Sequence, residues 1–249
     1  MKITKEVLDL IRSGKSINKI KQETGFGKST IYYHYKKLRG KKIKKVTVSF
    51  KSEDELGEFL GIFSGDGSFF KDNKSHYRIR LHIGYYEKGY IEYLQKRLPQ
   101  WFNKKPFIHI VYYKNKPSCL VFIYSEKEIY LLLKKYLKWD TKKTYTIQLK
   151  DFNLKKLEFN LGFLRGLIDT DGNYFHPKKR LSFATTSVNL AKQVESIIKY
   201  NLDTIPNYYI IKKKNRADLH VFTLHGKKAI RIIDRINPQN QTKKYTVVV

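Results

Sequence analysis

An internal repeat constrains the fold of this chain more than any other feature. The segment Leu60-Gly-Ile-Phe-Ser-Gly-Asp-Gly-Ser-Phe-Phe70 is matched by Arg165-Gly-Leu-Ile-Asp-Thr-Asp-Gly-Asn-Tyr-Phe175, which places Asp66 and Asp171 in corresponding positions. After each segment the sequence predicts a strand pair, a helix, a hairpin, another helix and a closing Thr-Lys-Lys. We therefore expect an α+β fold in which two α-β-β-α-β-β-α units form a pseudo-dimer. The boundaries are placed at residues 1–45, 46–150 and 151–249.

The helix before each Asp-Gly carries a small residue at every fourth position: Gly57, Gly61, Gly65 and Gly162, Gly166, Thr170. Glycine inside a helix costs about 1 kcal/mol relative to alanine, so its repeated use indicates that two backbones approach closely. The pattern predicts that the two helices pack on each other and bring Asp66 and Asp171 together. We expect the first helix to begin after Ser52 and the second near Asn153, each ending at a left-handed glycine.

Two aspartates at adjoining helix C-termini are unfavourable for stability. The helix dipole disfavours negative charge there, and two neighbouring carboxylates repel each other. A divalent cation with oxygen ligands removes this conflict, and Mg²⁺ suits phosphodiester hydrolysis because it activates water and stabilises the leaving oxygen. A single Asp-Gly is usually a turn, but two copies with matching flanks favour a metal site.

The charge of the chain points to a polyanionic partner. Lys and Arg number 51 against 22 Asp and Glu, which gives a net charge of +29. Nucleic acid is the first candidate for this partner. The alternative explanation of the charge is a set of solvated, lysine-rich faces. A membrane is not indicated, because the sequence contains no apolar run near 18 residues. The single cysteine, Cys119, excludes an internal disulfide and a cysteine metal cage. Without a recognisable signal peptide, we expect a cytoplasmic, nucleoid-associated protein.

Residues 1–45 predict a small DNA-binding domain. Three helical patterns lie near residues 4–13, 16–24 and 28–38, with a break at Thr24-Gly25-Phe26-Gly27. On the third helix, Ile31, Tyr35 and Leu38 share the inner face. The opposite face carries polar and basic side chains that could enter the major groove of DNA, namely Ser29, Thr30, Tyr33, Lys36 and Lys37. We interpret this as a helix-turn-helix followed by a basic linker; the alternative is a three-helix packing module.

Two strands alternate between apolar and polar residues. In residues 77–85 the apolar set should pack on helices, while Arg78, Arg80 and His82 should face DNA. In residues 179–186 the polar face, with Arg180 and Ser182, is less charged, so the two half-sites should differ in sequence. His82 has no partner histidine at metal-ligand spacing, which favours a role on the DNA side. A later basic loop suits phosphates and contains Lys212, Lys213, Lys214 and Arg216.

The segments 59–67 and 164–172 resemble the two defining motifs of the LAGLIDADG homing endonucleases in their single-chain, double-motif form, and the resemblance covers residues 51–249. The first motif departs from the pattern at Ser64 and Gly65. The resemblance implies essential acids at Asp66 and Asp171 that share Mg²⁺, with Mn²⁺ as a substitute, and carbonyl ligands from Gly65 and Thr170. It also implies basic residues at Lys143 and Lys244, chosen from two Lys-Lys pairs, that polarise water or phosphate.

The same resemblance implies a monomer with saddle-shaped sheets over a long, asymmetric double-stranded DNA site. Cleavage would cross the minor groove and leave short 3′ overhangs. Two alternatives keep the fold but not this activity. One is a catalytically silent DNA-binding transcription regulator; such regulators tend to lose the acids, which this chain keeps. The other is a maturase that binds intron RNA.

Overall fold

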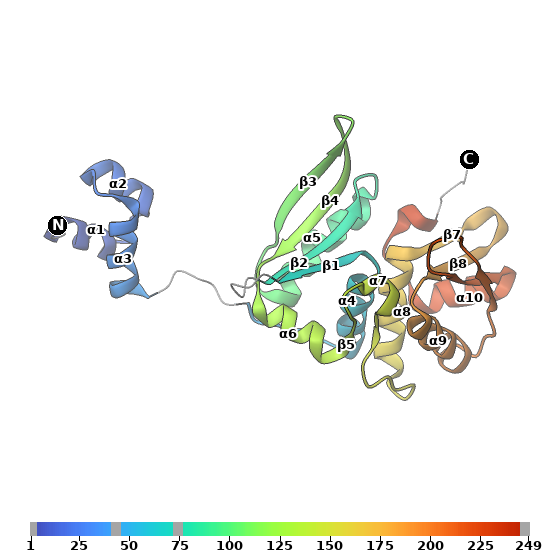
Figure 1. Ribbon diagram of the computed structural model, residues 1–249. Coiled ribbons are helices and arrows are strands. Elements are labelled where there is room, and N and C mark those ends of the chain that lie inside the picture. The colour runs from blue at the N-terminus through green and yellow to red at the C-terminus, as the bar shows by residue number, and fades with distance from the viewer. Residues whose placement is uncertain (1–3, 41–45, 72–76, 245–249) are drawn as a thin grey trace. The chain divides into compact units, whose positions relative to one another are not determined.

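The computed structural model describes residues 4–40, 46–71 and 77–244, without the side chains of residues 243 and 244. The chain divides into two compact units, Met1–Lys45 and Val46–Val249 (Figure 1). Within the described residues, no helix combines the length and the apolar character needed to cross a membrane.

The first unit is a bundle of three helices, α1 (Lys5–Arg12), α2 (Ile17–Thr24) and α3 (Lys28–Arg39). Ser16 caps α2 by accepting a hydrogen bond from the Lys19 N–H, and Gly25 ends it at a φ of 70°. The small core consists of Val7, Ile11, Ile20, Ile31 and Tyr35. The expectation that Leu38 joins this core is wrong, since its side chain is 42% exposed. Leu38 is the penultimate residue of α3, about 10 Å along the helix from Ile31.

The second unit contains the repeated element order that the sequence predicts, and the α+β fold prediction is confirmed. The first half comprises α4 (Glu53–Asp66), β1 (Gly67–Lys71), β2 (Tyr77–Gly84), α5 (Lys88–Phe102), β3 (Phe107–Tyr113), β4 (Lys116–Tyr124) and α6 (Lys127–Tyr136). The connection holds β5 (Leu137–Lys138), α7 (Lys143–Thr146) and β6 (Gln148–Leu149). The second half comprises α8 (Leu157–Asp171), β7 (Gly172–Phe175), β8 (Arg180–Thr185), α9 (Val188–Ser196), β9 (Asn207–Ile211), β10 (Leu219–His225) and α10 (Gly226–Ile236). Short helical turns η1 (His176–Lys178), η2 (Ile197–Asn201) and η3 (Gln241–Lys244) complete it.

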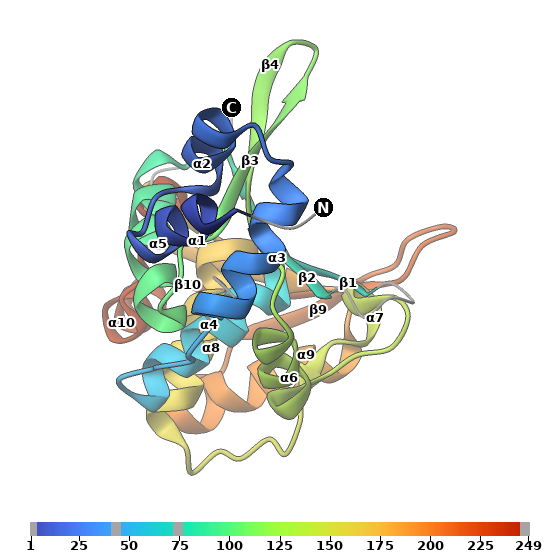
Figure 2. The same cartoon turned by 90° about the vertical axis from the view of Figure 1, so that its left-hand side faces the viewer.

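Each half builds one four-stranded antiparallel sheet, ordered β1-β2-β4-β3 in the first and β7-β8-β10-β9 in the second. In both halves the outermost hairpin extends beyond the helices (Figures 1 and 2). The predicted inner faces are confirmed, because Ile79, Leu81 and Ile83 of β2 and Leu181 and Phe183 of β8 are buried in one continuous core. The alternate residues therefore form a second face on each sheet, turned away from this core.

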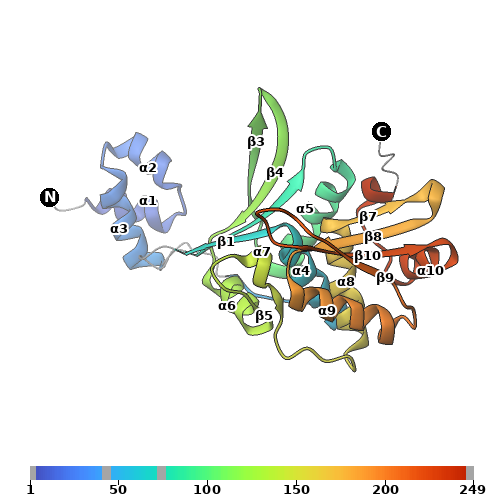
Figure 3. The same ribbon diagram turned by 45° about the vertical axis from the view of Figure 1, so that its right-hand side comes forward.

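The helices α4 and α8 pack side by side between the two sheets (Figure 3). A Cβ atom at Gly61 would lie 2.2 Å from the carbonyl oxygen of Phe163, and one at Gly166 would lie 2.3 Å from that of Glu58. Gly57 and Gly162 lie equally close to the facing backbone. The prediction of a glycine-lined helix pair is thus confirmed: at each step only hydrogen fits between one helix and the facing carbonyl.

Two predictions about helix ends are wrong. The second helix begins at Leu157 rather than near Asn153, whose side chain instead accepts a hydrogen bond from the Lys155 N–H in a turn. Gly67 and Gly172 end their helices in extended conformations, with φ of −81° and −79°, because a strand follows at once. Gly67 is required by space, since a Cβ atom there would lie 2.3 Å from the carbonyl oxygen of Phe63.

Candidate active site at the helix seam

The C-terminal ends of the glycine-lined helices carry Asp66 and Asp171, the last residues of α4 and α8. A Cβ atom at Gly65 would lie 2.1 Å from Thr170 Oγ1 and 3.1 Å from Asp171 Oδ2. The Asp171 carboxylate therefore lies beside the residue that precedes Asp66. Asp171 is exposed and Asp66 is half-buried, so water or a ligand can reach this end of the seam.

Lys143, the first residue of α7, lies at the same place. Its Nζ donates hydrogen bonds to the carbonyl oxygens of Phe63, Ser64 and Gly65, at 2.7, 2.8 and 3.1 Å. Carbonyls in the last turn of a helix lack partners within the helix and carry its negative dipole end, so an ammonium group stabilises them. Burial lowers the pKa of Lys143 to about 8, although the attraction of Asp171 and Asp66 opposes this shift. A lysine with such a pKa is still largely protonated at neutral pH.

A hollow of about 190 Å³ opens beside these groups. Its lining comes from α4, α7, α8 and β8 and includes Gly65, Lys143, Asp171 and Thr185. This volume holds several water molecules. The site therefore joins a carboxylate, a half-buried cation and solvent at one point between the two halves.

The oxygen groups at the seam suit a hard divalent cation. Mg²⁺ typically binds one or two protein carboxylates and keeps water or phosphate as its other ligands. Asp66 and Asp171 provide two carboxylates, and among the described residues no group of three or more His, Cys, Asp or Glu side chains forms a closed metal cage. The carbonyl oxygen of Gly65 accepts from Lys143 and retains a second lone pair. The donor set thus fits an open Mg²⁺ site shared with a phosphate.

A buried polar cluster next to the site was missed by the sequence analysis. Asp169, which is 1% exposed, accepts hydrogen bonds from the backbone N–H groups of Gln239 and Asn240 at 3.1 and 2.8 Å. The Asn240 side chain donates to Glu87 Oε2 at 2.8 Å and to the Asp169 carbonyl at 2.9 Å. Burial raises the pKa of Asp169 to about 7, against the effect of the two N–H donors. The one sequence signal was an acid at 169 where the first motif has Ser64.

This cluster ties the segment before η3 to the end of α8 and, through Glu87, to the first half of the unit. The predicted Lys244 ends η3, but its side chain lies outside the described part of the structure, so its role stays a prediction.

The predicted DNA-facing residues of the sheets lie on the faces turned away from the core. Arg78 is exposed, whereas Arg80, His82, Arg180 and Ser182 are half-buried. His82 Nε2 lies 3.0 Å from Ser68 Oγ, and burial, together with Arg80 and Lys143, lowers its pKa. Among the described residues, the Nε atoms of Arg80 and Arg180 are buried and have no hydrogen-bond partner.

The other predicted contact residues lie on the surface of their units. Lys214 is exposed, and Lys212 pairs with Asp218 at 2.7 Å. On α3, four of the five predicted side chains are exposed and Thr30 is half-buried. Their exposure is compatible with DNA contact, and the helix-turn-helix interpretation stays a prediction.

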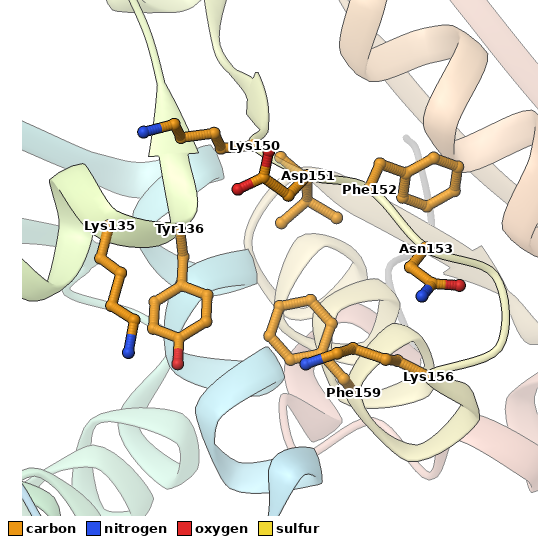
Figure 4. A pocket seen from close by; sticks show the side chains of 9 residues that line it. Lys135, Tyr136, Lys150, Asp151, Phe152, Asn153, Lys156 and Phe159 are labelled. Atoms are coloured by element: carbon orange, nitrogen blue, oxygen red, sulfur yellow. The ribbon is translucent and has the colours of Figure 1, made fainter.

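A larger pocket of about 330 Å³ lies elsewhere (Figure 4). Lys156 and Phe159, at the N-terminal end of α8, line it together with Tyr136 and Asp151. A helix of 15 residues is about 22 Å long, so this pocket is separated from Asp171 by most of α8. It is not part of the site formed by the two aspartates.

Comparisons with known proteins agree with this arrangement. Residues 158–240 match the LAGLIDADG-like domain family. No curated protein sequence matches the chain. Among solved structures, the homing endonuclease I-WcaI bound to its DNA recognition sequence is 15% identical, with coverage of 91% of this chain and 98% of that chain and a TM-score of 0.54. I-DmoI in complex with DNA and Ca is 21% identical, with coverage of 74% and 89% and a TM-score of 0.52.

A second I-DmoI structure, in complex with DNA and Mn, is 18% identical, covers 74% of this chain and 96% of that chain, and has a TM-score of 0.51. At these identities the structural matches establish the fold alone. The family match covers the second half only. The first half has a sheet of the same strand order, and its helix α4 packs on α8 of the second half. Residues 158–240 thus match the LAGLIDADG-like domain family, and the two halves together have the fold of the homing endonucleases I-WcaI and I-DmoI.

Proposed function

We propose that this chain is a site-specific, metal-dependent endonuclease that cleaves both strands of DNA. The observation that carries the proposal is the convergence of Asp171, the Gly65–Asp66 end of α4 and the Lys143 ammonium at one solvent-accessible point of the seam. Each half supplies one acid from an equivalent helix end, as hydrolysis of two antiparallel strands requires.

The residues of the seam have distinct roles in this proposal. Asp66 and Asp171 hold Mg²⁺, with carbonyl oxygens of Gly65 and Thr170 as further ligands. When bound, the ion lowers the pKa of water and stabilises charge on the phosphate and the leaving oxygen. Lys143 keeps a positive charge beside both acids. Its three N–H groups donate to the carbonyls of Phe63, Ser64 and Gly65, and in this proposal one of them turns to water or to a phosphate oxygen when DNA is bound. Lys244 is the proposed counterpart in the second half.

The rest of the chain provides DNA binding. A net charge of +29 favours a polyanion, and the polar faces of both sheets lie on the side away from the core. Because Arg78 and Arg80 lie on one face and Arg180 and Ser182 on the other, we propose a long, asymmetric duplex target bound by a single chain. Cleavage across the minor groove, with short 3′ overhangs, follows the proposed resemblance to homing endonucleases. The helix-turn-helix adds a further DNA contact.

The test compares acid-to-amide variants. Asp66→Asn and Asp171→Asn keep size and shape but remove the charge that holds the cation, so both should bind a selected duplex and fail to cut it in Mg²⁺. Asp234→Asn, on the exposed surface of α10, is the matched control and should cut normally. Cleavage that survives either seam variant would refute the assignment. Specific duplex binding without metal-dependent cleavage by the unaltered protein would indicate a regulator instead.

A further inference from the structure

The strand register allows the outward faces of the two sheets to be compared position by position. Gly67 and Gly172, which follow the two acids, pair with Leu81 and Phe183, so these positions are equivalent. The next row on each face follows from the pairing. In the first sheet it is Ser68, Arg80, Ile123 and Phe107. In the second sheet it is Asn173, Ser182, Thr223 and Asn207.

The two residues of this row that lie on the outer hairpin of each sheet, β3–β4 or β9–β10, differ in chemistry between the sheets. Ile123 and Phe107 are apolar, and Phe107 is 67% exposed. The equivalent Thr223 and Asn207 carry a hydroxyl and an amide. Ile123 points away from the core because its neighbour Phe122 is fully buried on the other face. The first sheet therefore presents an apolar pair, directly beside Arg80, on its outward surface.

We propose that Phe107 and Ile123 contact thymine methyl groups in the major groove of the half-site bound by the first sheet. This inference rests on the proposed function. The thymine C5-methyl is the apolar group on the major-groove edge of the bases, and aliphatic and aromatic side chains contact it. Arg80 and Arg78 on the same face favour DNA as the occupant, since guanidinium groups bind phosphates and guanine edges. In the second sheet Thr223 is only 8% exposed, and the exposed Asn207 amide takes the place of Phe107, so this position recognises its half-site by hydrogen bonds.

The register also places this preference within the half-site. Ser68 lies two residues after Asp66, whereas Phe107 lies three strand spacings farther out, or about 14 Å. The dependence on thymine therefore belongs to base pairs away from the cleavage point.

The experiment replaces thymine by uracil, which keeps base pairing and lacks only the methyl group. A randomised duplex library is first selected for binding to the full chain. The selected duplex is then rebuilt with uracil in one half at a time, and affinity is measured in EDTA. Loss of one buried methyl should weaken binding about fourfold. We expect this loss in one half only.

Variants assign the effect to the two side chains. The double variant Phe107→Asn, Ile123→Asn removes both apolar side chains and should abolish the difference between thymine and uracil. Ile108→Thr, on the same strand but the opposite face, is the control and should keep it. Circular dichroism checks that both variants fold.

The proposal is overturned if uracil is tolerated equally in both halves, if its effect persists in the double variant, or if neither half contains thymine. Cleavage of the thymine duplex in Mg²⁺ is scored separately. A uracil effect without cleavage would reject the nuclease function and keep this contact, whereas cleavage without a uracil effect would do the reverse.

Discussion

Replacing Gly61 by alanine tests the close packing on which the site depends. The new Cβ atom would lie 2.2 Å from the carbonyl oxygen of Phe163, and contacts under 3.0 Å are essentially never seen, so the two backbones must separate by at least 0.8 Å. Overpacking of this kind costs about 3 kcal/mol when backbone must move. The higher helix propensity of alanine returns about 1 kcal/mol. We therefore expect Gly61→Ala to lower the free energy of unfolding by about 2 kcal/mol.

Urea unfolding, followed by far-ultraviolet circular dichroism, measures this change. Gly89→Ala is the matched control, because Gly89 is also helical but a Cβ atom there would meet nothing within 4 Å. That control should be unchanged or more stable by up to about 1 kcal/mol. If Gly61→Ala were as stable as the control, the seam would not be packed at backbone contact, and the argument that it positions the two acids would fail.

Three further changes have defined outcomes. Ser52→Ala removes the acceptor of the Glu55 N–H bond at 3.2 Å, so urea unfolding should show a loss of about 1 kcal/mol, and an unchanged midpoint would contradict the cap. The pKa of Asp169 is raised from 3.8 to about 7, so between pH 3.8 and 7 the folded state keeps a proton that the unfolded state has released. The free energy of unfolding, measured in EDTA, should therefore fall as the pH rises through this range. Asp169→Asn should flatten this slope; an equal slope in the variant would point to another group. Lys143→Met should reduce the cleavage rate about 10²-fold, while the DNA affinity measured in EDTA is largely kept. The control variant Lys142→Met alters the exposed neighbour and should cut normally. Equal cleavage rates in the two variants would refute a catalytic role for Lys143.

Local sequence patterns determined the architecture. The Asp-Gly repeat and the four-residue glycine spacing predicted the paired helices, because glycine at such a cost is explained by backbone contact alone. The alternation in residues 77–85 predicted which side of β2 is buried, since side chains in a strand point to opposite faces in turn. The spacing and the alternation depend on residues a few positions apart, and the repeat on direct comparison of two segments, so all three can be recognised without a structure.

The tertiary structure decided what depends on distant residues meeting. The sequence offered Lys142 and Lys143 as near-equivalent choices, and only the packing of α7 against the end of α4 places Lys143 Nζ on three carbonyls about 80 residues away in the chain. The Asp169–Asn240–Glu87 cluster spans separations of 71 and 153 residues, which no local period encodes. The apolar pair Phe107 and Ile123 became visible through strand register alone. Spacing along the chain determines which face a side chain takes, but which groups share a site depends on how separate elements pack.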